Sequence, residues 1–187
     1  MLWPFIIIMT AVLGWQKRYL TLLWWLVLVA GTFGLLVGAK LWFEACGRVS
    51  GSQLYSPSGH TAGSTFVYGA ALVLFTRRPM VGAGIAIVIA VLMGLSRVLV
   101  HAHNLVEVIV GAVIGLSGVF LLAMSQYGKS ATNVSVSKAR WSGMIVMGLA
   151  LLVLTATLHG IRSPAEHWVE IWSHRFVSKA VQCPTAF

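Results

Sequence analysis

Acidic residues are scarce in this 187-residue chain, which has only 4 Asp and Glu side chains, and all charged residues together make up 9% of it. Soluble globular domains carry about 25% charged residues, so this composition leaves too little polar surface to cover a soluble fold. Hydrophobic residues make up 58% of the chain, and the mean hydropathy is +0.88. The composition therefore excludes a soluble protein and predicts an integral membrane protein.

The chain also lacks internal repeats and low-complexity tracts, and the small polar stretch 128–137 is a loop between helices rather than a linker between domains. We therefore expect a single membrane-embedded domain over residues 1–187. Only two cysteines are present, Cys46 and Cys183, and they lack the spacing of metal ligands. Either a disulfide between them or two unpaired thiols fits this count.

Long apolar segments dominate the sequence. Crossing a hydrocarbon core takes about 20 apolar residues; five segments have this length, and a sixth, residues 2–14, is marginal. Because backbone polar groups in lipid must be satisfied within a segment, and no alternating barrel pattern is present, these segments are expected to be helices. The sequence predicts an all-α polytopic membrane bundle of about six transmembrane spans. The five long segments are Tyr19–Ala39, Pro57–Phe75, Met80–Arg97, Asn104–Met124 and Trp141–His159.

Glycines recur in the segment Asn104–Met124. Gly111, Gly115 and Gly118 lie on or near one face of the expected helix. Small residues at such spacing permit close contact between membrane helices. We therefore expect this face to pack tightly against a neighbouring helix.

Basic residues outnumber acidic ones by 13 to 4, which gives a formal net charge of +9. In a membrane protein this excess indicates topology signals and attraction to anionic lipid headgroups, and no basic run interleaved with aromatic residues favours a nucleic-acid partner. If the spans alternate, 17–18, 77–78 and the 129–140 loop share one side, and short basic loops mark the cytoplasm. The opposite side, with both termini, then faces the periplasm of an inner membrane.

The C-terminal tail has an amphipathic pattern. Trp168, Ile171, Trp172 and Phe176 recur at helical spacing between charged residues. The pattern predicts a helix over about 164–181, which either lies in the membrane interface or packs across the mouth of the bundle.

His103 and Glu107 are the first candidates for chemistry. Four residues separate them at the start of an apolar helix, so both side chains share one face. The carboxylate can then accept a hydrogen bond from one imidazole nitrogen and leave the other nitrogen exposed, as in an activated nucleophile or base. A pair that only stabilises the helix end has the same spacing. Because ionisable residues within membrane spans are costly and tend to be functional, we favour the catalytic interpretation.

A second group of residues is typical of an anion site. Pro57-Ser58-Gly59-His60 begins an apolar segment, where free N–H groups of a helix N-terminus favour a phosphate. The planar guanidinium group of Arg97 can bind two phosphate oxygens at once, and Lys40 and Arg48 add positive charge from the preceding loop. Each basic residue alone would more often be a side chain that snorkels to the interface.

These two groups together resemble the second and third signatures of the type 2 phosphatidic acid phosphatase family, which shares its core with vanadium haloperoxidases. The resemblance rests on Pro57-Ser58-Gly59-His60 and on Ser96-Arg97 with His103 and Glu107. It implies a catalytic core over about residues 36–125. It also implies a phosphatase without metal or cofactor, in which His103 attacks phosphorus and His60 protonates the leaving lipid oxygen. The implied phosphate-binding residues are Lys40, Arg48, Ser58, Gly59, Ser96 and Arg97.

The chain departs from the family pattern at two places. The third signature usually ends in Asp, whereas this sequence has Glu107, which keeps the charge but changes the reach. The first signature usually has Arg-Pro seven residues after a Lys, whereas Lys40 is followed by Gly47 at that position and by Arg48 one step later.

Three other functions use the same residues. A lipid phosphotransferase would pass the phosphoryl group to an acceptor hydroxyl. A metal hydrolase would use His60, His101, His103 and Glu107 as ligands, although the basic residues already supply the charge of a metal. A non-catalytic lipid-binding or transport protein would retain the pocket alone. The expected partners are a lipid phosphate substrate and the bilayer; the sequence leaves open which lipid is bound and the oligomeric state.

Overall fold

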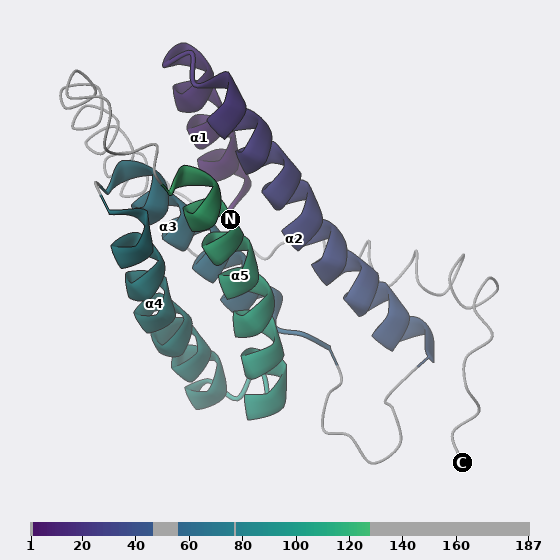
Figure 1. Cartoon of the computed structure of the whole chain (residues 1–187). Helices are drawn as coiled ribbons and strands as arrows, with labels where there is room; N and C mark the ends of the chain where they lie inside the picture. Colours follow the sequence, from purple (N-terminus) through teal and green to yellow (C-terminus); the bar gives the residue numbers. More distant parts are fainter. Residues whose placement is uncertain (1, 47–55, 77, 128–187) are drawn as a thin grey trace.

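The structure is a computed structural model that describes residues 2–46, 56–76 and 78–127, and these residues form five helices and no strand (Figure 1). The prediction of an all-α fold is confirmed. The helices are α1 (Trp3–Trp15), α2 (Tyr19–Cys46), α3 (Gly59–Phe75), α4 (Pro79–Leu99) and α5 (Leu105–Gln126).

Three helices, α2, α4 and α5, are long and apolar enough to cross a membrane. Helix α1 has 13 residues and a length of about 20 Å, which is shorter than a hydrocarbon core of about 30 Å. Helix α3 has 17 residues. The five helices overlap the first five predicted apolar segments, but α2 continues past Ala39 to Cys46, so Lys40 lies on a helix and not in the predicted loop. Trp141–His159 and the predicted tail helix 164–181 lie outside the described residues.

Helix α3 is the centre of the bundle and packs against α4, α5, α2 and α1. Most of its side chains are buried, including Phe66, Val67 and Val73. A helix that is apolar or small on all sides can be a membrane span or be surrounded by other helices, and the burial of its side chains shows that α3 is surrounded. Helices α3 and α5 both start at one end of the bundle, and α4 ends there, because short connections link α3 to α4 and α4 to α5 (Figure 1).

The glycine face of α5 packs against α3, as the sequence predicts. A Cβ at Gly111 would lie 2.6 Å from the carbonyl oxygen of Ser58, and a Cβ at Gly115 would lie 2.5 Å from that of Ala62. At Gly118 a Cβ would lie 2.7 Å from the ring of Phe66. Because these glycines have no side chain, α5 can lie this close to the parallel helix α3.

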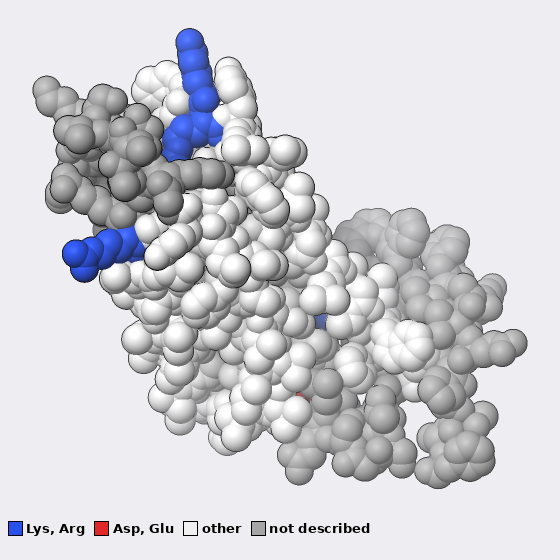
Figure 2. Space-filling model, viewed as in Figure 1, with Lys and Arg blue, Asp and Glu red and all other residues white. Residues whose placement is uncertain are grey.

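At the opposite end of the bundle, polar side chains join the start of α2 to the end of α5. The buried Gln126 accepts hydrogen bonds from the Thr21 hydroxyl at 3.3 Å and from Arg18 Nη2 at 3.4 Å. On the face that Figure 2 shows, Lys and Arg side chains of the described residues project from this end. The basic end and the end where α3 and α5 begin are therefore separated by the length of the bundle.

Candidate active site

Ser58, His103 and Glu107 lie where the N-termini of α3 and α5 meet the C-terminus of α4. The backbone N–H of Ser58 donates to the carbonyl oxygen of Glu107 at 3.0 Å, which fixes the start of α3 to the first turn of α5. The positive ends of both helix dipoles therefore lie at the same place. This arrangement favours an anion.

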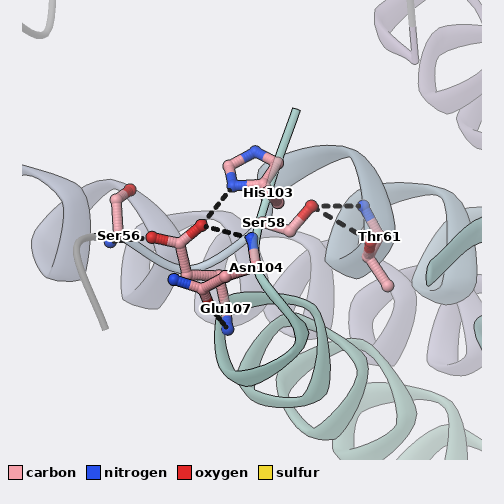
Figure 3. A network of polar contacts seen from close by, with 6 residues as sticks. All are labelled: Ser56, Ser58, Thr61, His103, Asn104 and Glu107. Carbon is pink, nitrogen blue, oxygen red and sulfur yellow. Dashed lines mark hydrogen bonds and ion pairs between the residues drawn. The ribbon is translucent and has the colours of Figure 1, made fainter. Parts of the chain in front are cut away.

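His103 and Glu107 are paired as the sequence predicts. His103 Nδ1 lies 2.8 Å from Glu107 Oε2, and the second ring nitrogen points away from the carboxylate (Figure 3). The His103 side chain is 21% exposed and that of Glu107 is 7% exposed. A buried carboxylate thus orients a ring whose other nitrogen remains accessible.

Glu107 has two further donors. Its Oε2 accepts from the backbone N–H of Asn104 at 3.2 Å, and its Oε1 accepts from the backbone N–H of Ser56 at 3.2 Å (Figure 3). Backbone donors of this kind stabilise the charged form of a carboxylate. They also explain how Glu can stand where the family usually has Asp: the longer side chain folds back to the first N–H of its own helix and still contacts His103.

The bond to Asn104 belongs to a complete capping box. The Asn104 side chain accepts from the backbone N–H of Glu107 at 3.0 Å, while the Glu107 side chain accepts from the Asn104 N–H. This feature escaped the sequence analysis. An N-cap residue followed three positions later by Glu before an apolar run is its sequence signal, and Asn104-Leu105-Val106-Glu107 matches it.

The Pro57-Ser58-Gly59-His60 segment begins α3, with Ser58 as the N-cap. The Ser58 hydroxyl is fully buried, lies 3.0 Å from the Thr61 hydroxyl and accepts from the Thr61 N–H at 3.4 Å. Its observed role is therefore to stabilise the first turn of α3. Gly59 leaves room for the side chain of Lys40. A Cβ at Gly59 would lie 3.4 Å from Lys40 Cε, so the Lys40 side chain reaches from α2 to the start of α3.

Arg97 occupies the last turn of α4, where a cation is favoured by the helix dipole. After it the chain turns through a Schellman motif. His101 N–H donates to Val98 O at 3.0 Å, Ala102 N–H donates to Arg97 O at 3.0 Å, and His101 has a φ of 53°. This turn reverses the chain within a few residues, so that His103 follows closely after Arg97.

Two buried polar atoms at this end have no hydrogen-bond partner among the described residues. They are Arg97 Nε and the hydroxyl oxygen of Ser56. Buried donors are normally paired, and an orphaned one at a site calls for a ligand or other explanation. An oxyanion of the substrate would satisfy the guanidinium.

The remaining predicted residues have different positions. His60 is the second residue of α3 and its side chain is exposed. Ser96 is exposed, and its hydroxyl donates to Met93 O at 2.7 Å, so the structure does not bring it into the polar network. Arg48 lies outside the described residues. Cys46 at the end of α2 is disulfide-bonded, and Cys183, the only other cysteine of the sequence, also lies outside them.

The described ranges contain no group of three or more His, Cys, Asp or Glu side chains that could hold a metal ion. His60, His101, His103 and Glu107 therefore do not form a metal-binding group in this structure. Among the described residues, Arg97, Lys40 and the helix N-termini bring positive charge to this end of the bundle.

Two comparisons with known proteins find similar sequences. The PAP2 superfamily matches residues 23–132, which include His103 and Glu107, the start of α3 and the end of α4. The chain is also similar to an uncharacterized 22.5 kDa protein in the cps region of Klebsiella pneumoniae. The two are 31% identical over 164 residues, which cover 83% of this chain and 76% of that protein. No solved structure matches. With its helical membrane core and its paired signatures, the chain belongs to the PAP2 superfamily, a superfamily of phosphatases.

Proposed function

We propose that the protein is a membrane lipid phosphate phosphatase that works through a phosphohistidine intermediate. The observation that supports this most directly is the His103–Glu107 pair, in which a buried carboxylate holds Nδ1 at 2.8 Å and leaves Nε2 accessible. The carboxylate fixes the tautomer with the proton on Nδ1 and the lone pair on Nε2. This is the form that attacks an electrophile.

In the first step His103 Nε2 forms a bond to phosphorus and the bond between phosphorus and the lipid oxygen breaks. The leaving oxygen needs a proton, and His60 in its protonated form donates it, since His60 stands exposed in the first turn of α3. The imidazolium that forms on His103 is stabilised by Glu107. The products are phosphohistidine and the free lipid alcohol from a phosphomonoester, or the lipid monophosphate from a diphosphate.

In the second step a water molecule attacks phosphorus and the bond between phosphorus and Nε2 breaks. The neutral His60 takes a proton from the water, which returns both histidines to their starting states and releases inorganic phosphate. No electrons are gained or lost in either step.

In the proposed mechanism, cations and a backbone donor balance the charge on the phosphoryl oxygens. Arg97 and Lys40 supply cations, and the Gly59 N–H at the start of α3 supplies a backbone donor. Phosphoryl transfer depends mainly on such positioning and electrostatic stabilisation. The proposed mechanism therefore uses no metal and no cofactor.

The substrate is proposed to be a lipid because the site lies at the end of apolar helices, at the level of a headgroup whose tail would remain in the bilayer. The substrate head is a phosphomonoester or diphosphate. We further propose that this end faces the periplasm from the inner membrane. The basic residues at the opposite end support that orientation, and the disulfide at Cys46 fits an oxidising compartment.

The proposed function is tested by phosphate release from purified protein in detergent or vesicles. The lipid panel consists of polyprenyl phosphates and diphosphates, phosphatidic acid, phosphatidylglycerol phosphate and lipid A, each without an acceptor lipid, with chelator present in one arm. Phosphate release that survives the chelator is the expected result. Turnover only when an acceptor lipid is added would instead indicate a phosphotransferase, and loss with the chelator would indicate a metal enzyme.

His103→Asn is the matched variant, because it removes the nucleophile but keeps a polar side chain. It should fold and release no phosphate, and the acid-labile phosphoenzyme of the wild type should be missing. Substantial turnover by the folded variant would remove His103 from the centre of the mechanism.

The orientation is tested with single cysteines in a background without Cys46 and Cys183. Ala102 lies exposed in the turn beside the site, and Tyr127 lies 71% exposed at the far end of α5. Ala102→Cys should react with an impermeant thiol reagent from outside, and Tyr127→Cys only after the membrane is opened. The reversed pattern would place the site in the cytoplasm.

A further inference from the structure

Asn104 stands between the proposed nucleophile His103 and helix α5 and has two links to Glu107. Its side-chain oxygen accepts from the Glu107 N–H at 3.0 Å, and its own N–H donates to Glu107 Oε2 at 3.2 Å. The first bond fixes the backbone of Glu107, and the second fixes its carboxylate. Asn104 therefore constrains both ends of the Glu107 side chain.

The carboxylate oxygen bonded by Asn104 is the one that holds the imidazole. Glu107 Oε2 accepts from Asn104 N–H and lies 2.8 Å from His103 Nδ1, while Oε1 is held by the Ser56 N–H. Figure 3 shows the three residues around this one oxygen. A shift of the first turn of α5 would move Oε2 and with it the direction of the His103 lone pair.

Burial makes this cap hard to replace. Glu107 is 5% exposed, so water cannot readily satisfy its N–H if the Asn104 side chain is removed. The first turn of α5 would have to shift to find another acceptor. A misplacement of about 1 Å in a reacting group can lower turnover by roughly 100-fold.

We propose that Asn104 is a positioning residue for phosphoryl transfer, acting on His103 through Glu107. This inference rests on the proposed function. It assigns Asn104 no contact with substrate, so its removal should lower kcat and leave KM largely unchanged.

The test compares three substitutions in the full-length protein. Asn104→Ala removes the cap and should lower kcat by about 10- to 100-fold with less than about a 3-fold change in KM. Asn104→Ser retains a capping oxygen and should restore kcat to within about 3-fold of the wild type. Asn104→Gly also lacks the side-chain oxygen but is a tolerated N-cap residue, so it keeps the test valid if the Ala variant does not fold.

Ser117→Ala is the control, because the Ser117 hydroxyl donates to Ile114 O at 2.8 Å on the exposed face of the same helix. Its kcat and KM should both remain unchanged. Wild-type kcat in folded Asn104→Ala or Asn104→Gly would overturn the inference. A rise in KM with unchanged kcat would also overturn it, by assigning Asn104 to substrate binding.

A second readout separates this inference from the proposed function. If the wild type hydrolyses no lipid phosphate, the proposed function fails, and the rate at which diethyl pyrocarbonate modifies His103 is then measured by mass spectrometry. A changed rate in Asn104→Gly that Asn104→Ser restores would still support the positioning role. Equal rates in all variants would overturn it.

Discussion

Gly111 of α5 lies directly against the backbone of Ser58, the N-cap of α3: a Cβ at Gly111 would lie 2.6 Å from the Ser58 carbonyl oxygen and 3.3 Å from its nitrogen. The glycine at position 111 therefore sets the distance between the N-termini of α3 and α5. Backbone atoms cannot move aside as a flexible side chain can, so any larger residue at 111 must push the helices apart.

Gly111→Ala should destabilise the protein by about 1–3 kcal/mol, as expected for overpacking a tight contact. It should also reduce phosphate release, because the bond from Ser58 N–H to Glu107 O spans the same contact. Gly84→Ala in α4 is the matched control, since nothing lies within 4 Å of a Cβ there. The melting temperature in detergent and the rate of phosphate release are measured for both variants. Equal melting temperatures and rates for Gly111→Ala and Gly84→Ala would contradict the close contact.

Glu107→Gln should lower turnover by several orders of magnitude, by analogy with the roughly 10⁴-fold loss when a triad carboxylate becomes an amide. The amide nitrogen cannot accept, so either the Ser56 N–H or both His103 and the Asn104 N–H lose their acceptor. Turnover and folding of the purified variant are measured together. A near wild-type rate would make the pair merely structural.

Glu107→Asp is the companion variant and should keep measurable activity. It retains the charge but is one methylene shorter, so we expect it to hold His103 and to weaken the bond to the Ser56 N–H or the capping box. Its melting temperature should therefore fall together with its rate. If Glu107→Asp were as inactive as Glu107→Gln, reach rather than charge would be the limiting property.

His60→Ala should reduce the hydrolysis of lipid phosphates far more than that of an activated aryl phosphate. A lipid alkoxide is a poor leaving group that needs a proton, whereas a nitrophenolate leaves without one. The ratio of kcat/KM for the two substrates is the measurement. Equal losses on both would assign His60 to phosphate binding or to structure.

His101→Gly should retain activity and raise the stability by up to about 1 kcal/mol. His101 has a φ of 53°, a left-handed conformation that costs a non-glycine residue about 1–2 kcal/mol, and it occupies the position where helix ends usually have glycine. His101→Val, with a branched Cβ, should lower the stability. Loss of turnover in folded His101→Gly would instead give this side chain a role at the substrate.

Much of the fold could be predicted from the sequence because its determinants are local. Apolar segments of sufficient length must become helices in lipid, and α2, α4 and α5 lie where those segments are. The pairing of His103 with Glu107 also followed from their spacing, but the helical reason was wrong: His103 precedes the N-cap Asn104 and lies outside α5, and the capping box brings the carboxylate back to it. The glycine face of α5 also followed from helical spacing alone.

What the tertiary structure alone decided are the contacts between segments far apart in the chain and the direction of each side chain. The bond from Ser56 N–H to Glu107 spans 51 residues, and the reach of Lys40 to Gly59 depends on how α2 packs on α3. Ser96 and Arg97 are neighbours in one signature, yet the Ser96 hydroxyl bonds its own helix while Arg97 Nε is buried. Successive residues of a helix point about 100° apart, so a signature in the sequence cannot state which of its members face the site; the packing of α4 against α3 and α5 decides that.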